Sequence, residues 1–167
     1  MKFETTNEIE KFSFRDAKIT ELHKSGDDLV LNLEGLIVLP GNSMNREFSA
    51  SYAQGAILRF VGFEMEAGIK EGLKKYDANE NLVAVIEDEP LDGEGLEDLL
   101  MKKMPLSWLY DVQEIIAEEE HREAVLGIEM PKENESDPTE VTDAYQMKIR
   151  YQKCQIGFEG YLSRVQV

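Results

Sequence analysis

One stretch near the end of the chain, AYQMKIRYQKCQIGFEGYLS at residues 144–163, constrains the fold more than any other. In an extended strand, side chains two residues apart lie on the same face. Apolar residues occupy alternate positions here, and the phase changes near Lys153. The first set is Tyr145, Met147, Ile149 and Tyr151, and the second is Cys154, Ile156, Phe158, Gly160 and Leu162. The pattern predicts a long C-terminal strand with a bend, which curved sheets and small barrels need.

Alternation of the same kind marks much of the remaining chain. Residues 1–40 contain two predicted strands, with a bulge where the phase set by Phe12 and Phe14 changes. KSGDD at 24–28 has the composition of a tight hairpin turn, and strand-like alternation resumes at residue 56. We therefore predict an α+β fold that is mainly β. Six to eight antiparallel strands would form a curved meander that closes toward a barrel or sandwich.

A single short helix is predicted at 95–104. Its acids come first and its bases last, which suits the helix dipole, and its apolar residues share one face. The following segment, 108–120, fits either a helix or a strand, because both spacings of apolar residues occur in it. Its aromatic and β-branched residues favour two strands, SWLYDVQEIIA and EAVLGIEM, that turn around Glu118–Arg122.

A chain of 167 residues forms one domain on length alone and can bury a substantial core. Two long loops are expected within this domain. Residues 41–55 are small and polar, and residues 131–143, PKENESDPTEVTD, are acidic and contain two prolines, which predicts a mobile surface loop.

The net charge of −16 is concentrated in one internal third of the chain. Residues 87–143 contain nineteen acids and four bases, a balance of −15, whereas the rest contains fifteen acids and fourteen bases. Such a field repels nucleic acid and anionic membranes and attracts a basic partner. The alternative interpretation is that acidic loops only keep the protein soluble.

Half of a calcium-loop signature occurs at KKYDANENLVAVIED. Asp77, Asn79 and Asn81 stand at the first, third and fifth ligand positions, and Asp88 stands at the twelfth. The sixth position requires a sharp turn that glycine makes and Leu82 resists, and a β-branched run follows instead of a helix. A turn between two strands is therefore predicted, with no metal.

The other reactive side chains do not form a catalytic pattern. His23 and His121 are nearly a hundred residues apart and have no partner at zinc-ligand spacing. Cys154 lies in an apolar alternation and is expected in the core. No phosphate loop, nucleophile elbow or dinucleotide fingerprint is present, so no catalytic residue, cofactor or metal site is predicted. Glu64 and Glu66, two apart on a strand, are compatible with acid/base catalysis on a glycoside.

The sequence also sets expectations about location. One cysteine excludes an internal disulfide and indicates a reducing compartment. No signal peptide and no apolar run of membrane-spanning length is present, so a cytoplasmic protein that does not enter the membrane is expected. The sequence carries no signal for an oligomeric state.

The opening segment FSFRDAKITELHKSGDDLVLNLEGLIVLPGNS resembles the start of small uncharacterised domains encoded in Gram-positive bacterial genomes. The residues that carry the resemblance are Phe14, Asp16, Ala17, Ile19, Gly26, Asp27 and Leu29. They cover about thirty residues of the chain. The resemblance implies a bacterial cytoplasmic protein and brings no catalytic residues.

Three functional hypotheses follow. The first is a non-enzymatic binding protein, inhibitor- or immunity-like, whose acidic region docks a basic protein. The second is a small-molecule carrier that uses a barrel interior, with 41–55 as its lid. The third is a carboxylate-based hydrolase. The candidate interaction surface of the first hypothesis consists of Trp108, Tyr110, Glu118, Glu119, Glu120 and His121.

Overall fold

A computed structural model describes residues 1–102, 107–132 and 142–166. The chain is 64% strand and 8% helical, which confirms the prediction of a mainly β protein with antiparallel sheets. The strands are β1 (Phe3–Thr6), β2 (Phe12–Ser13), β3 (Lys18–Ser25), β4 (Asp28–Glu34), β5 (Ile37–Val38), β6 (Ala50–Gln54), β7 (Ala56–Val61), β8 (Glu64–Lys70), β9 (Leu73–Tyr76), β10 (Leu82–Ile86), β11 (Glu89–Asp92), β12 (Trp108–Glu118), β13 (His121–Pro131), β14 (Thr142–Tyr151), β15 (Lys153–Phe158) and β16 (Gly160–Val165). The helical elements are η1 (Ile9–Lys11), a 3₁₀ turn, and α1 (Gly93–Lys102).

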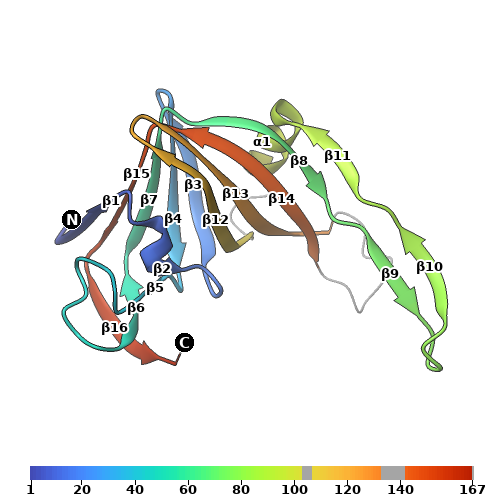
Figure 1. The fold of residues 1–167 in the computed structure, drawn as a ribbon, viewed down its shortest axis with the longest axis horizontal. Coiled ribbons are helices and arrows are strands. Elements are labelled where there is room, and N and C mark those ends of the chain that lie inside the picture. The colour runs from blue at the N-terminus through green and yellow to red at the C-terminus, as the bar shows by residue number, and fades with distance from the viewer. Residues whose placement is uncertain (103–106, 133–141, 167) are drawn as a thin grey trace.

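Three sheets organise these strands (Figure 1). The largest has ten strands in the order β1-β15-β7-β4-β3-β12-β13-β14-β8-β11. A four-stranded sheet, β16-β6-β5-β2, lies beside its first half, and β9 and β10 form a ribbon of their own. Within the ten-stranded sheet, the predicted meander holds for β3–β4 and for β12–β13–β14, while the other neighbouring strands are not consecutive in the chain.

The C-terminal segment is three strands instead of the single bent strand that the alternation predicted. β14 pairs with β8 and β15 pairs with β7, so two bent segments run side by side over their length. The β7–β8 segment bends at Gly62, which has a φ of 65°, and the β14–β15 segment bends beside it at Gln152. The Gln152 N–H donates to the Val61 carbonyl at 2.8 Å, so the two bends are adjacent. β16 then leaves for the smaller sheet and pairs with β6. Alternation along one strand does not report which neighbours the strand pairs with.

The ambiguous segment 108–120 is a strand, paired along its length with β13. The predicted helix is present and begins two residues earlier than expected, at Gly93. Asp92 Oδ1 accepts the Gly95 N–H at 2.6 Å and so caps its first turn. Leu96 and Leu100 are buried against β8, as their spacing requires.

The core is a continuous apolar cluster between the two larger sheets and under α1. It includes the alternating residues of β14 and β15, with Ile149 and Phe158 fully buried, and the expected core residue Cys154, which is 1% exposed. Phe158 packs on Phe3 and Phe12 at ring-centroid distances of 5.0 and 6.4 Å. These contacts join the N-terminal and C-terminal strands.

The structure describes the whole of the first expected loop, 41–55, and little of the second, 131–143. The predicted loop 41–55 is shorter, because β6 already begins at Ala50. Asn45 Nδ2 donates to the carbonyls of Val38, Leu39 and Ser49, so an amide side chain holds this loop to the sheet. The acidic loop 131–143 lies mostly at 133–141, outside the described residues.

The calcium-like signature is a turn, as predicted. Asp77 Oδ1 accepts the N–H groups of Asn79 and Asn81 at 2.8 and 3.0 Å, and Glu80 has a φ of 63°. The turn joins β9 to β10 at the end of the projecting ribbon. Within the described part of the chain, no group of three or more His, Cys, Asp or Glu residues is arranged to hold a metal ion.

Candidate interaction site

The six residues of the predicted interaction surface all lie on the β12–β13 hairpin, but at opposite ends of it. Trp108 and Tyr110 open β12, and Glu118 closes it, opposite His121. Ten residues of extended strand span about 33 Å. The structure therefore gives two separate features, an aromatic base and an acidic tip, instead of one patch.

The aromatic base is largely packed against its own sheet. The Tyr110 ring lies over Gly127, where a Cβ atom would come within 2.8 Å of it, and the Gln146 amide donates to the Tyr110 hydroxyl at 2.9 Å. Burial, and then the charges of Glu71 and Glu129, raise the pKa of Tyr110. Trp108 is 36% exposed and has Lys18 Nζ 5.6 Å from a ring centroid. Tyr110 thus stabilises the sheet, whereas the partly exposed side chain of Trp108 can still contact a partner.

The acidic tip is fully exposed. Glu119 and Glu120 form the two-residue connection between Glu118 and His121, and all four residues are exposed. Glu120 has a φ of 60°, the left-handed region that side chains other than glycine rarely adopt. Neither glycine nor asparagine, the residues that favour this conformation, stands there. The hairpin therefore displays three consecutive carboxylates on a strained two-residue turn.

Several other acids of the 87–143 region form ion pairs with bases on other elements of the fold. The ion pairs are Glu97–Lys24 at 2.9 Å, Glu114–Arg122 at 2.9 Å, Glu123–Lys148 at 3.8 Å, Glu123–Arg150 at 3.9 Å and Asp143–Lys70 at 3.6 Å. Glu118, Glu119 and Glu120 form no ion pair with any residue that the structure describes. The tip is consequently a cluster of three adjacent carboxylates whose charge no base among the described residues compensates.

A buried polar cluster that was not predicted from the sequence lies on the inner face of the same hairpin. Arg122 pairs with Glu114 at 2.9 Å, and both side chains are at most 15% exposed. Arg122 stands directly opposite Tyr151, whose hydroxyl is buried. Arg122 Nε and the Tyr151 hydroxyl have no hydrogen-bond partner among the described residues. Burial raises the pKa values of both Tyr151 and Cys154.

A sequence signal for this cluster does exist. Arg122 has the same parity as Ala124, Leu126 and Ile128, which are all buried in β13. A strand that places every even-numbered residue inward also places this arginine inward. An inward arginine needs an acid beside it, and Glu114 on the paired strand supplies that acid.

Glu64 and Glu66, whose spacing is compatible with acid/base catalysis but also with a solvent-facing strand, belong to a network of ion pairs. Glu66 lies 2.6 Å from Arg150 Nη2 and 3.3 Å from Lys148 Nζ, while Glu64 lies 3.9 Å from Arg150 Nη1. Glu123, on the neighbouring strand and 7% exposed, shares both bases. The network joins β8, β14 and β13 across the sheet, so these carboxylates have a structural role that requires no reaction.

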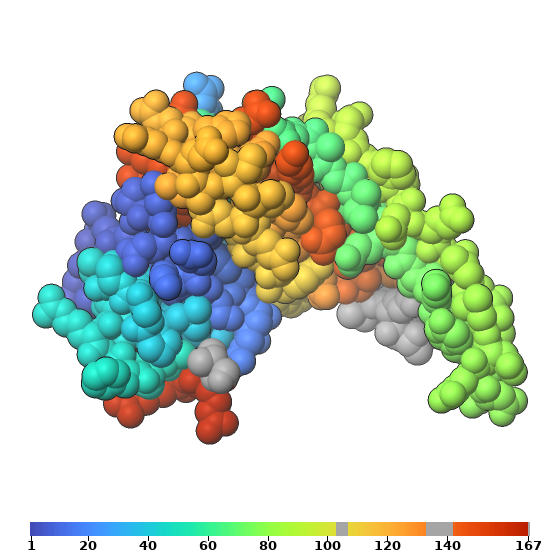
Figure 2. Space-filling view, in the orientation of Figure 1, coloured from blue at the N-terminus to red at the C-terminus, as the bar shows by residue number. Residues whose placement is uncertain are grey.

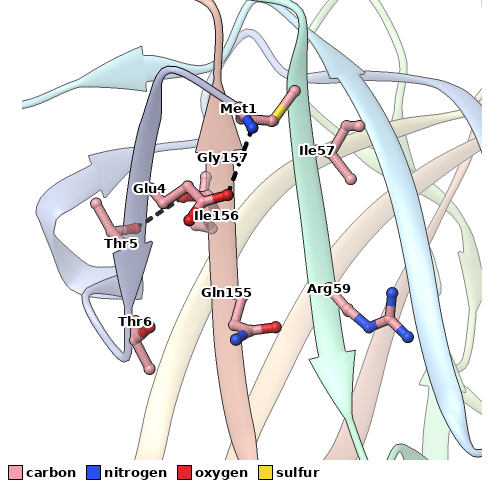
Figure 3. A pocket seen from close by; sticks show the side chains of 9 residues that line it. All are labelled: Met1, Glu4, Thr5, Thr6, Ile57, Arg59, Gln155, Ile156 and Gly157. Atoms are coloured by element: carbon pink, nitrogen blue, oxygen red, sulfur yellow. Dashed lines mark hydrogen bonds and ion pairs between the residues drawn. The ribbon is translucent and has the colours of Figure 1, made fainter.

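The cavity drawn in Figure 3 lies on the outer side of β1, β15 and β7 and has a volume of about 220 Å³. Several of its polar groups are engaged with one another or with nearby residues. Thr5 Oγ1 donates to the Ile156 carbonyl at 3.1 Å, and Arg59 pairs with Asp28 at 2.7 Å. This arrangement leaves few groups that would orient a ligand.

No helix among the described residues is long and apolar enough to cross a membrane. Comparisons with protein-family models, with curated proteins and with solved structures found no match.

Proposed function

We propose that the protein is a non-enzymatic binding protein that docks a basic protein partner through the acidic tip, Glu118–His121, of its β12–β13 hairpin. The observation that carries the proposal is the set of three adjacent, exposed carboxylates that pair with no base in the described part of the chain. A partner that brings Lys or Arg side chains to the tip supplies the missing counter-charges. The net charge of −16 adds a long-range attraction for such a partner.

The hairpin is suited to present these carboxylates in a fixed place. β13 is paired on one side with β12 and on the other with β14, over ten residue pairs with the latter. The Glu114–Arg122 ion pair lies directly behind the tip. A partner therefore meets a surface that is ordered before binding, which reduces the entropy lost on association.

A matched set of charge variants tests the proposal. E118Q/E119Q/E120Q removes three charges from the tip, and E10Q/E34Q/E159Q removes three charges from exposed sites elsewhere. Both variants have the same net charge. We expect the immobilised wild-type protein and the control to capture the same basic protein from a lysate at low salt, and the tip variant to lose it. Equal capture by the two variants would contradict the proposal.

We further propose that the ten-stranded sheet closes on itself in the manner of a small barrel. Support comes from two pairs of strands that follow each other in the chain, β7 with β8 and β14 with β15. β15 pairs with β7 near one end of the strand order and β14 pairs with β8 near the other, so these strands connect the two ends of the sheet. β3 and β12 meet at only one residue pair, Lys18 and Trp108, so they form the weakest seam of such a barrel. Amide protection at this seam comparable to that in β4 and β13 would support closure, whereas fast exchange there would indicate that the sheet is open between β3 and β12.

A second candidate function, a small-molecule carrier, is favoured by the two buried polar atoms without partners. Arg122 Nε is a donor and the Tyr151 hydroxyl is both donor and acceptor, and a small polar ligand would satisfy both. Native mass spectrometry of gently purified protein tests this function. An added mass of a few hundred daltons that disappears in Y151F would support it. A clean apo mass would leave the binding protein as the sole proposal.

A further inference from the structure

The ribbon of β9 and β10, residues 73–86, projects from the body as an arm (Figure 1). Figure 2 shows it as a separate extension of the molecular surface. It carries five large apolar side chains that are at least half exposed: Tyr76 58%, Leu82 52%, Val83 61%, Val85 53% and Ile86 51%. A surface of this composition on a projecting element is typical of an interaction site.

The arm is an ordered element. Its turn is closed by Asp77, which accepts two backbone N–H groups, and by the Asp77 N–H, which donates to the Asn81 carbonyl at 2.9 Å. At its base, the Gly72 N–H donates to Asp88 Oδ1 at 2.7 Å. These bonds hold the ribbon at both ends, although two-stranded ribbons are only marginally stable in water without further burial.

The free edge of β10 lacks the features that normally prevent strand pairing. Lysine, proline and inward-pointing charges are the usual protections of an edge strand. β9 has Lys74 and Lys75, whereas β10 reads Leu-Val-Ala-Val-Ile without a charge or a proline. Its only irregularity is a bulge at its start, between Leu82 and Ala84. The unprotected edge is therefore that of β10.

We propose that β10 pairs antiparallel with β10 of a second copy of this chain. The segment reads nearly the same in both directions, so a two-fold axis at Ala84 puts Val83 opposite Val85 and Leu82 opposite Ile86 of the partner. If the bulge moves the axis to Val85, the pairs directly around it are still apolar. Two arms then form one four-stranded sheet, β9-β10-β10-β9, and cover each other's exposed side chains.

A second copy fits this edge better than an unrelated chain does. Each copy carries a net charge of −16, yet the strand that meets its twin has no charge, so the contact itself contains no opposed carboxylates between Leu82 and Ile86. The contact is smaller than the roughly 800 Å² per partner of a standard interface. We therefore expect a reversible dimer with a Kd on the order of 10–100 μM. It does not involve the acidic tip.

A charge exchange tests the pairing. V83K/V85K brings lysines together at either position of the axis, and V83E/V85E adds glutamates in the same way. Measured by sedimentation, each variant should be monomeric where the wild type dimerises, and an equal mixture should recover the dimer through Lys–Glu pairs. K74E, on β9, is the control and should leave dimerisation unchanged.

Cross-linking through a single introduced cysteine determines the register. Opposed residues of antiparallel strands have Cα atoms about 4.5–5.5 Å apart, within the range of a disulfide. Either A84C or V85C should form a covalent dimer under mild oxidation. A117C, at an exposed site of β12, should not, and native Cys154 is 1% exposed and does not interfere.

Three results would each overturn the proposal. The first is a wild type that stays monomeric well above the expected Kd. The second is a wild-type dimer that both charge variants retain. The third is a mixture of the charge variants that does not recover the dimer, together with A84C and V85C that do not cross-link. A partner of another kind would then cover the arm. Capture of a basic protein at the acidic tip would be unaffected by any of these results, which separates the two proposals.

Discussion

At the scale of single residues, Glu120 combines backbone strain with exposure. A left-handed φ costs a side-chain-bearing residue about 1–2 kcal/mol, and glycine avoids that cost but loses more entropy on folding. We expect E120G to raise the free energy of unfolding by about 0.5–1 kcal/mol. In a chain of this size the Tm would rise by about 1–4 °C, which differential scanning calorimetry detects.

The same substitution should weaken capture of a basic partner, because it removes one of three tip carboxylates. Strain that persists at a binding surface is typical of a functional position. E120A, which removes the carboxylate and retains the strain, is the control. A gain of stability in E120A equal to that in E120G would contradict a role for the backbone conformation.

Tyr151 gives a prediction of the opposite kind, in which removing a polar atom helps. A buried hydroxyl without a partner costs about 1–3 kcal/mol, so Y151F should raise the free energy of unfolding by about 1 kcal/mol. Y52F is the control, because the Tyr52 hydroxyl donates to Asp16 at 2.7 Å and its loss should lower stability. A loss of stability in Y151F would instead indicate that a ligand or an ordered water satisfies the hydroxyl.

Alkaline pH provides a second readout for Tyr151. Burial raises its pKa above the ordinary value of 10, so the unfolded chain releases this proton at a lower pH than the folded chain does. Titration of Tyr151 therefore leaves stability unchanged below pH 10 and lowers it as the pH rises from 10 toward the higher folded value. Y151F should show a shallower fall of stability above pH 10 than the wild type.

At the scale of elements, the sequence predicts what depends on neighbours along the chain. The helix follows from the spacing of Leu96 and Leu100, and the turn at 77–81 follows from Asp and Asn chemistry. The aromatic and β-branched residues of 108–118 correctly favoured a strand over a helix. In each case, local conformation and the burial pattern give the same answer.

What the sequence did not predict depends on pairing between distant strands. Nothing in the alternation around Lys153 shows that β14 and β15 have different partners, β8 and β7. The exposure of the LVAVI run was also unforeseen, since such a run ordinarily indicates a buried strand. The distance between Trp108 and the acidic tip was unforeseen as well, because the sequence left 108–120 open between a helix and a strand. A helix over these residues would be about half as long as the strand that the structure shows.

The turn of the arm gives a prediction at this scale. The backbone N–H groups of Asn81 and Asn79 hold the pKa of Asp77 below its ordinary 3.8, since they bind the ionised carboxylate. Ionised Asp77 therefore stabilises the turn fully above pH 3.8, and this stabilisation is lost as the pH falls through the lower folded value. In D77A we expect faster amide exchange at Asn79 and Asn81 at neutral pH.

The control for this variant is E80Q, in the same turn, which should leave the exchange rates of both amides unchanged. Exchange in β13 should also stay as in the wild type, because the ribbon is paired separately from the large sheet. Slower exchange in D77A, or equal effects of D77A and E80Q, would contradict a capping role for the Asp77 carboxylate.

At the scale of the whole molecule, two surfaces of opposite chemistry lie on different elements. The acidic tip ends the β12–β13 hairpin of the large sheet, and the uncharged edge of β10 belongs to the arm. A tip of this kind attracts opposite charge from a distance, whereas the apolar edge acts only on contact. The two proposed associations therefore use separate surfaces and do not compete with each other.

Ionic strength should affect the two associations in opposite directions. The Debye length falls from about 10 Å at 0.1 M salt to about 3 Å at 1 M, which screens attraction and repulsion alike. Capture of a basic partner should weaken by roughly tenfold or more as salt rises over that range, because attraction at the tip contributes to it. Dimerisation should tighten roughly severalfold. Salt screens the repulsion between two copies of charge −16, whereas it does not weaken the burial of the β10 side chains. Sedimentation of the protein alone and pull-down at the same salt concentrations measure both. If dimerisation weakened with salt, charged groups would have to hold the two copies together, and the uncharged β10 edge would not be the contact.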